Sequence, residues 1–143
     1  MTLPPERPMA AYLKLYAATT AIFLAIDLLW LGVIAKGFYQ ETMGHLMRAD
    51  VQWGAALLFY AIYVVAIIVL CVRPDEPTQT VLRASLFGAL FGLAAYAAFD
   101  LTSLALFKDF PVKGAVVDLL WGTVLTGSVS TLSLLTWRSL QRG

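Results

Sequence analysis

Three aspartates lie within long apolar stretches of the sequence: Asp27, Asp100 and Asp118. A carboxylate at the centre of a bilayer costs about 2.5–3.5 kcal/mol, so each needs a proton, a partner or water. A cluster of such groups can hold a proton, a cation, or a cationic or hydroxyl-rich part of a ligand. The alternative is that protonated carboxyls only join helices through hydrogen bonds. Both interpretations place the aspartates inside a helical bundle.

The composition indicates a membrane protein. The chain has 143 residues, of which 60% are hydrophobic and 13% charged, whereas soluble domains average about 45–50% and about 25%. Four apolar stretches each exceed the ~20 residues needed to cross a hydrocarbon core of about 30 Å. They cover residues 10–35, 51–72, 82–107 and 114–137. The sequence therefore predicts an all-α fold, a four-helix transmembrane bundle, as a single integral-membrane domain over residues 1–143.

The basic residues predict an orientation. Six Lys and Arg residues flank the side that carries both termini: Arg7, Lys14, Arg73, Arg83, Arg138 and Arg142. Four flank the other side: Lys36, Arg48, Lys108 and Lys113. The positive-inside rule then favours both termini in the cytoplasm. The net charge of +1 argues against a nucleic-acid surface, and the single cysteine and single histidine indicate no metal site.

Helix geometry predicts that the three aspartates lie at similar depth. At 1.5 Å per residue, Asp27 and Asp100 lie about 12–13 Å inside the boundary lysines that follow them. Asp118 lies about 7 Å inside Lys113, which precedes it. All three carboxyls are therefore expected in the half of the membrane away from the termini, which is the outer-leaflet half.

Residues four apart share a helix face, and this predicts which side chains surround the carboxyls. The third helix places Gly88, Gly92, Tyr96 and Asp100 on one face, and the fourth aligns Gly114, Asp118 and Gly122. Glycines permit close helix contact, so both aspartates are expected to face inward. Trp30 and Trp121 each follow an aspartate by three residues, within reach of its carboxyl. His45 lies in the first loop, on the same side of the membrane as the aspartates. It is predicted to be either a site residue or a polar residue at the membrane interface. The candidate ligand-binding residues are Asp27, Asp100, Asp118, Trp30, Trp121, Tyr96 and His45; the sequence indicates no catalytic residue or cofactor.

The sequence also contains a short internal similarity. Asp27-Leu-Leu-Trp30 recurs as Asp118-Leu-Leu-Trp121. This is consistent with a duplicated helical hairpin, although two short matches in apolar sequence also arise by chance.

Five motifs together resemble a known family. They are Asp27-Leu-Leu-Trp-Leu-Gly32, Gly44-His-Leu46, Phe59-Tyr60, Phe99-Asp-Leu-Thr-Ser103 and Asp118-Leu-Leu-Trp-Gly122. In this order and spacing the chain resembles the domain-of-unknown-function 2177 family of small bacterial membrane proteins, over nearly its whole length. The resemblance implies the bacterial inner (cytoplasmic) membrane and implies no activity. Where that family usually has Tyr-Asp-Leu-Thr-Asn, this chain has Phe99 and Ser103, which removes a hydroxyl and an amide.

Three functional hypotheses follow. The first is a carboxylate-lined site in the outer-leaflet half that binds a polar or cationic small molecule or a lipid headgroup. Transport by such a site is expected to need a homodimer, because four helices leave little room for a pathway. The second is a lipid-modifying enzyme with an aspartate as general base and His45 nearby. The third is an accessory subunit of a larger membrane complex, in which the Gly88 and Gly92 face packs on a partner.

Overall fold

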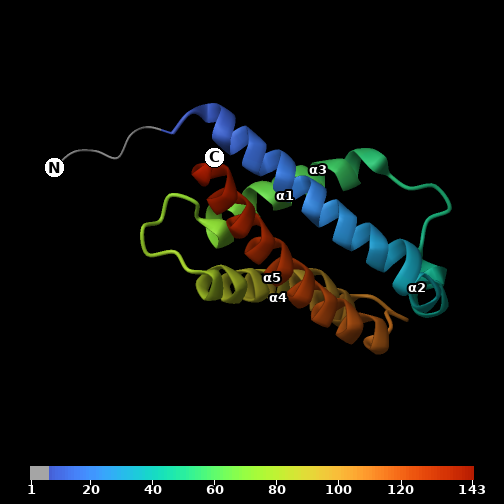
Figure 1. Ribbon diagram of the computed structural model, residues 1–143. Helices are drawn as coiled ribbons and strands as arrows, with labels where there is room; N and C mark the ends of the chain where they lie inside the picture. Colours follow the sequence, from blue (N-terminus) through green and yellow to red (C-terminus); the bar gives the residue numbers. More distant parts are fainter. Residues whose placement is uncertain (1–6) are drawn as a thin grey trace.

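A computed structural model describes residues 7–143, and this part of the chain is helical with no strand (Figure 1). Residues 1–6 lie outside the described part of the chain. Four helices are long and apolar enough to cross a membrane: Met9–Ile34, Trp53–Val72, Val81–Leu106 and Val112–Arg142. The prediction of an all-α chain with four membrane-length helices is confirmed.

Two of these helices end in a wider, π-helical turn. The first is α1 (Met9–Leu29) continued by η1 (Trp30–Ile34), and the second is α3 (Trp53–Ala66) continued by η3 (Ile67–Val72). The third and fourth are α4 (Val81–Leu106) and α5 (Val112–Arg142). The helix α5 extends beyond residue 137, where the apolar stretch ends, because its last residues are polar but still helix-forming.

The helices α4 and α5 form the central antiparallel pair, and α1 and η3 pack against α5. The start of α1, the C-terminus and the loop over residues 73–80 lie at one end of the bundle, and the α4–α5 turn lies at the other end with α2 (Lys36–Met43) (Figure 1). The short η2 (Gly44–Leu46) follows α2 and leads toward α3.

Glycines bring α4 and α5 into close contact. A Cβ atom added at Gly92 would overlap the carbonyl oxygen of Gly122, and one at Gly88 would overlap the side chain of Ser130. Close approach of this kind is the usual reason for small residues between membrane helices. The small-residue face of α4 therefore packs inside the chain, which removes the observation behind the accessory-subunit hypothesis.

The bundle has an aromatic and aliphatic core and an apolar outer surface. Phe23 of α1 makes edge-on contacts with Tyr60 and Tyr63 of α3, at centroid distances of 5.5 and 5.6 Å. Tyr63 in turn stacks on Phe91 of α4 at 5.2 Å. Large apolar side chains such as Leu90 are exposed on the outside, as a lipid-facing surface requires.

The helix α2 folds back over the end of the bundle. The π-helical turn η1 leads into Ala35, whose φ and ψ of −109° and 7° leave the helical region and redirect the chain. The side chain of Met43 then contacts α5 where Gly114 has none of its own. Because α2 lies over the start of α5, its side chains reach the polar interior.

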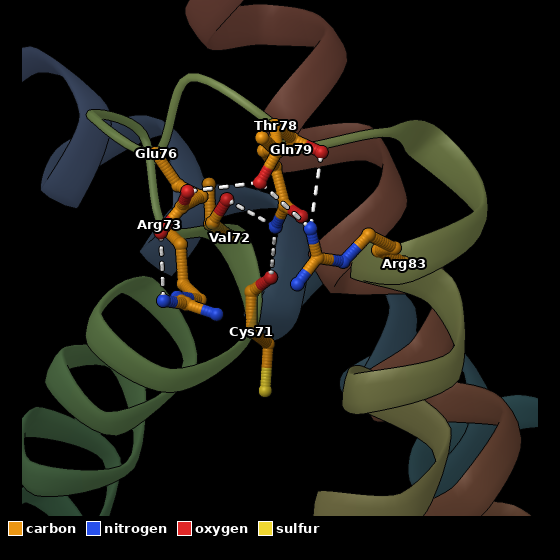
Figure 2. Close-up of polar contacts among 7 residues, drawn as sticks. All are labelled: Cys71, Val72, Arg73, Glu76, Thr78, Gln79 and Arg83. Atoms are coloured by element: carbon orange, nitrogen blue, oxygen red, sulfur yellow. Dashed lines mark hydrogen bonds and ion pairs between the residues drawn. The ribbon is translucent and has the colours of Figure 1, made fainter.

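At the opposite end, Gln79 closes the second membrane helix. Figure 2 shows its side-chain amide donating to the carbonyl oxygens of Cys71 and Val72, both at 2.7 Å. These carbonyls belong to the last turn of η3, where helix geometry leaves acceptors unpaired. Arg73, at φ 46°, ends the helix and pairs with Glu76 at 2.9 Å. The loop is thus held by its own polar side chains.

Candidate functional site

Asp27 accepts hydrogen bonds from two other helices. Its side chain is buried, with 4% exposure. The indole Nε1 of Trp121 donates to Oδ1 at 3.2 Å, and the hydroxyl of Tyr60 donates to Oδ2 at 3.3 Å. Trp121 thus bonds to an aspartate on another helix and not to Asp118, which lies three residues before it and within reach, because packing turns Trp121 of α5 toward α1.

Asp118 is bound from the folded-back helix α2. The hydroxyl of Tyr39 donates to Oδ1 of Asp118 at 2.8 Å and accepts the indole N–H of Trp30 at 3.2 Å. Burial raises the pKa of the Tyr39 phenol, so the hydroxyl keeps its proton and remains a donor. Trp30 therefore reaches Asp118 through Tyr39.

The two tryptophans join these halves into one network. The rings of Trp30 and Trp121 stack with centroids 4.4 Å apart and planes within 9°. The indole N–H of Trp121 donates directly to Asp27. The indole N–H of Trp30 donates to the Tyr39 hydroxyl, which in turn donates to Asp118. The repeated Asp-Leu-Leu-Trp motifs face each other across the bundle. Whether they arose by duplication stays a prediction.

Asp100 lies behind Asp118 and has no exposed surface. Among residues 7–143, neither of its carboxyl oxygens has a hydrogen-bond partner. Asp100 is therefore a buried polar group that the described part of the chain leaves unsatisfied, and such groups call for a specific explanation.

A cavity of about 440 Å³ opens beside this network. It is lined by the carboxyls of two of the aspartates and by aromatic and aliphatic side chains: Asp27, Asp118, Tyr60, Tyr96, Trp121, Phe59, Phe99, Leu31 and Ala95. Asp100 is not among the lining residues and lies deeper. The volume falls within the range of about 300–1,000 Å³ typical of small-molecule sites.

The cavity has an apolar rim. Leu31, Phe59 and Phe99 line it and are 40%, 46% and 59% exposed. Below the cavity, Tyr63 stacks on Phe91 and holds α3 against α4. Above this contact the N-terminal part of α3 diverges from α4 (Figure 1). The edge of the cavity is therefore formed by apolar side chains.

The remaining candidate residues are placed differently. Tyr96 lines the cavity, and its ring covers Gly122. His45 is exposed, and its Nε2 lies 2.9 Å from the carbonyl oxygen of Asp109, so it joins two loops outside the cavity. Gln52, which directly precedes α3, is also exposed.

Sequence reasoning missed the role of Tyr39 and the cavity rim. Tyr39 is placed by the reversal of the chain at Ala35, and no spacing in the sequence signals that reversal. Phe99 carried a usable signal, because it stands beside Asp100 at a position where a hydroxyl is expected from the family resemblance. The structure gives this position an apolar role at the rim.

The site lies within a segment that matches a protein family. A family model described as "Predicted membrane protein (DUF2177)" matches residues 12–135. The chain belongs to this family. The matched DUF2177 segment contains every residue of the network and the cavity. No curated protein and no solved structure matches the chain.

Proposed function

We propose that this DUF2177 protein binds a cationic amphiphile, an amine or quaternary ammonium group attached to an apolar chain, in the cavity beside Asp27 and Asp118. The observation that carries the proposal is the lining itself: two carboxyls and several aromatic rings, with no basic side chain. The cationic group would lie at the carboxyls, and the chain would leave past Phe59 and Phe99 into lipid. If the protein lies in a bacterial inner membrane with both termini in the cytoplasm, the aspartates lie in the outer-leaflet half. The ligand would then come from the outer leaflet.

The charge balance of the site supports a cationic ligand. Within residues 7–143, no Lys or Arg forms an ion pair with Asp27, Asp100 or Asp118. Lys113, the basic residue nearest in sequence to Asp118, lies over the ring of Phe38 at 5.7 Å. Asp27 accepts hydrogen bonds from Trp121 and Tyr60 but has no basic partner among the described residues. A bound cation would supply the counterion that an ionised carboxylate needs in such a buried place.

The aromatic lining supports an organic cation. Trp121, Tyr60 and Tyr96 present rings to the same space as the carboxyls. Aromatic faces attract ammonium groups, and rings combined with carboxylates recognise quaternary ammonium ligands. Among the described residues, no three His, Cys, Asp or Glu side chains gather in a way that could hold a metal ion. The lining therefore favours an ammonium group over a metal ion.

The lateral rim supports an amphiphile over a small water-soluble cation. Phe59 and Phe99 line the cavity and have largely exposed, apolar side chains. An alkyl chain at this rim would stay in an apolar environment while its headgroup reached the carboxyls. Transport, together with the homodimer that it is expected to need, stays a prediction.

The test is a titration in nanodiscs with a brominated alkyltrimethylammonium, because bromine quenches tryptophan fluorescence on contact. Trp30 and Trp121 report on the site. We expect saturable quenching by this probe, and only weak, non-saturating quenching by the brominated alcohol of equal chain length. Asp27→Asn keeps an oxygen acceptor for Trp121 and removes the charge, and should weaken binding about tenfold or more.

Asp50→Asn is the matched control, since Asp50 is an exposed loop aspartate. It should bind as the unmodified protein does. Equal quenching by the cation and the alcohol, or equal affinity in Asp27→Asn, would reject the proposal.

A further inference from the structure

The end of the bundle where α1 begins and α5 ends contains a second cavity, of about 420 Å³. We propose that this cavity binds a phosphate group, carried by an anionic lipid headgroup or present as a free phosphate ion. It lies between the loop after η3 and the last turns of α5, and three arginines line it: Arg7, Arg138 and Arg142. The proposal is independent of the proposed function, because this cavity shares no lining residue with the aspartate cavity.

The cavity carries an excess of positive charge. Its single acidic lining residue, Glu76, is already paired with Arg73 at 2.9 Å. Arg7 is 3.5 Å from Asp75, in a pair whose side chains are 38% and 54% exposed, and such exposed pairs hold their partners weakly. Among residues 7–143, no carboxylate pairs with Arg138 or Arg142. Guanidinium groups are thus available to an anion.

The arginines come from positions that let them converge. Arg138 and Arg142 are four residues apart on α5, so they lie on one helix face, one turn from each other. Arg7 precedes α1 and lies over the ring of Trp137 at 5.1 Å, which directs it toward the same part of α5. Guanidinium forks recognise phosphate oxygens with paired hydrogen bonds.

The cavity wall is held in place before any ligand binds. Arg138 donates to the carbonyl oxygen of Gln79 at 2.9 Å. Gln79 is itself fixed by its two hydrogen bonds to the end of η3 (Figure 2). Trp137 donates its indole N–H to the carbonyl oxygen of Pro74 at 3.1 Å. One N–H of Arg138 is thus used to orient the guanidinium, which leaves its other donors for a ligand.

The location fits a phosphate at the membrane surface. Arg138 comes directly after the apolar part of α5, and Trp137 is a residue type enriched at the membrane interface. Lipid phosphates lie at this depth, and basic pockets between helices on the cytoplasmic side bind anionic headgroups. With the termini in the cytoplasm, the cavity would face the inner leaflet.

The experiment is native mass spectrometry of the protein in detergent after incubation with phosphatidylglycerol, phosphatidylcholine or inorganic phosphate. The test variant is Arg138→Gln/Arg142→Gln. Arg142→Gln alone serves as a second variant, since the side chain of Arg142 makes no hydrogen bond or ion pair within residues 7–143. The control is Lys14→Gln/Arg83→Gln, which removes two charges at the same end but outside the cavity.

We expect the unmodified protein and the control to retain phosphatidylglycerol in preference to phosphatidylcholine. The test variant should retain about tenfold less phosphatidylglycerol than the control, and Arg142→Gln should fall between them. Displacement of the lipid by inorganic phosphate, or phosphate adducts lost in the same variants, would identify a free phosphate ion as ligand. Equal retention in all four proteins, equal losses in the test and control variants, or no preference between the two lipids would overturn the proposal.

Discussion

The indole nitrogen of Trp121 lies 3.2 Å from Oδ1 of Asp27, although the two residues are 94 positions apart in the sequence. This bond links the last membrane helix to the first in the interior of the bundle. The same tryptophan stacks on Trp30, which reaches Asp118 through Tyr39. The polar interior is therefore one connected network. A substitution of one member should change the contacts and the stability contributed by the others.

A double-mutant cycle measures the strength of the Trp121–Asp27 bond. Trp121→Phe removes the indole donor and keeps an aromatic ring, and Asp27→Asn keeps an acceptor. We expect a coupling free energy of about 0.6 kcal/mol and at most ~1.7 kcal/mol, the values found for hydrogen bonds inside membrane proteins. The readout is the free energy of unfolding in detergent.

Trp53→Phe is the control for this cycle, because Trp53 is 65% exposed. Paired with Asp27→Asn it should show no coupling. Equal coupling in both cycles would mean that the Trp121–Asp27 bond contributes nothing of its own.

Tyr39→Phe should loosen α2. The change removes the hydroxyl that joins Trp30 to Asp118. We expect faster amide hydrogen exchange over Lys36–Met43 and a nearly unchanged free energy of unfolding for the bundle, because α2 lies outside the four long helices. Tyr12→Phe is a matched control, since it also removes a tyrosine bond to an aspartate, Asp75, but at the other end. If α2 exchanges equally fast in both variants, Tyr39 does not fasten it.

The contact between α4 and α5 should not tolerate a methyl group at Gly92. A Cβ atom there would overlap the carbonyl oxygen of Gly122, and backbone atoms in a helix cannot move aside cheaply. We expect Gly92→Ala to lower the free energy of unfolding by about 1–3 kcal/mol. Gly54→Ala, where nothing lies within 4 Å of the added Cβ, should be neutral or stabilising by up to about 1 kcal/mol. A smaller loss at Gly92 than at Gly54 would contradict this packing.

The loop of Figure 2 should depend on the charge of Glu76. The hydrogen bond from the Thr78 hydroxyl, assisted by Arg73, lowers the pKa of the Glu76 carboxyl. A lowered pKa means that the ionised form stabilises the loop above the ordinary glutamate range, and that this stabilisation is lost as the pH falls through the folded-state pKa. Glu76→Gln imitates that loss at neutral pH. Faster amide exchange over residues 73–80 is expected, with Glu41→Gln in α2 as a control that leaves this loop unchanged.

The four helices could be predicted from the sequence because their apolar length is dictated by the membrane and leaves a direct signal. Inward-facing Asp100 and the glycines at 88 and 92 followed from helix periodicity, and both features are present. Partners across helices could not be predicted in this way. Periodicity identifies a face, whereas the rotation and tilt of neighbouring helices decide which residue meets which.

This limit explains the two main differences at the site. Trp121 bonds to Asp27 on another helix and not to Asp118 on its own, because α1 packs against α5 at that level. His45 was predicted either as a site residue or as an interfacial polar residue, from its side of the membrane alone. The fold of η2 places it against Asp109 in the neighbouring loop, and burial depth along a loop has no periodic signature that could have separated the two roles.

The most direct test of the central claim is native mass spectrometry of the protein released from nanodiscs made with lipid extract. The unmodified protein is compared with the triple variant Asp27→Asn, Asp100→Asn and Asp118→Asn, after equal thermal unfolding shows that both are folded. We predict a discrete adduct on the unmodified protein whose mass corresponds to an amine or quaternary ammonium amphiphile, and its absence from the variant. An identical adduct pattern on both proteins, or no adduct on either, would contradict a ligand site at the aspartates and favour protonated carboxyls that only join the helices.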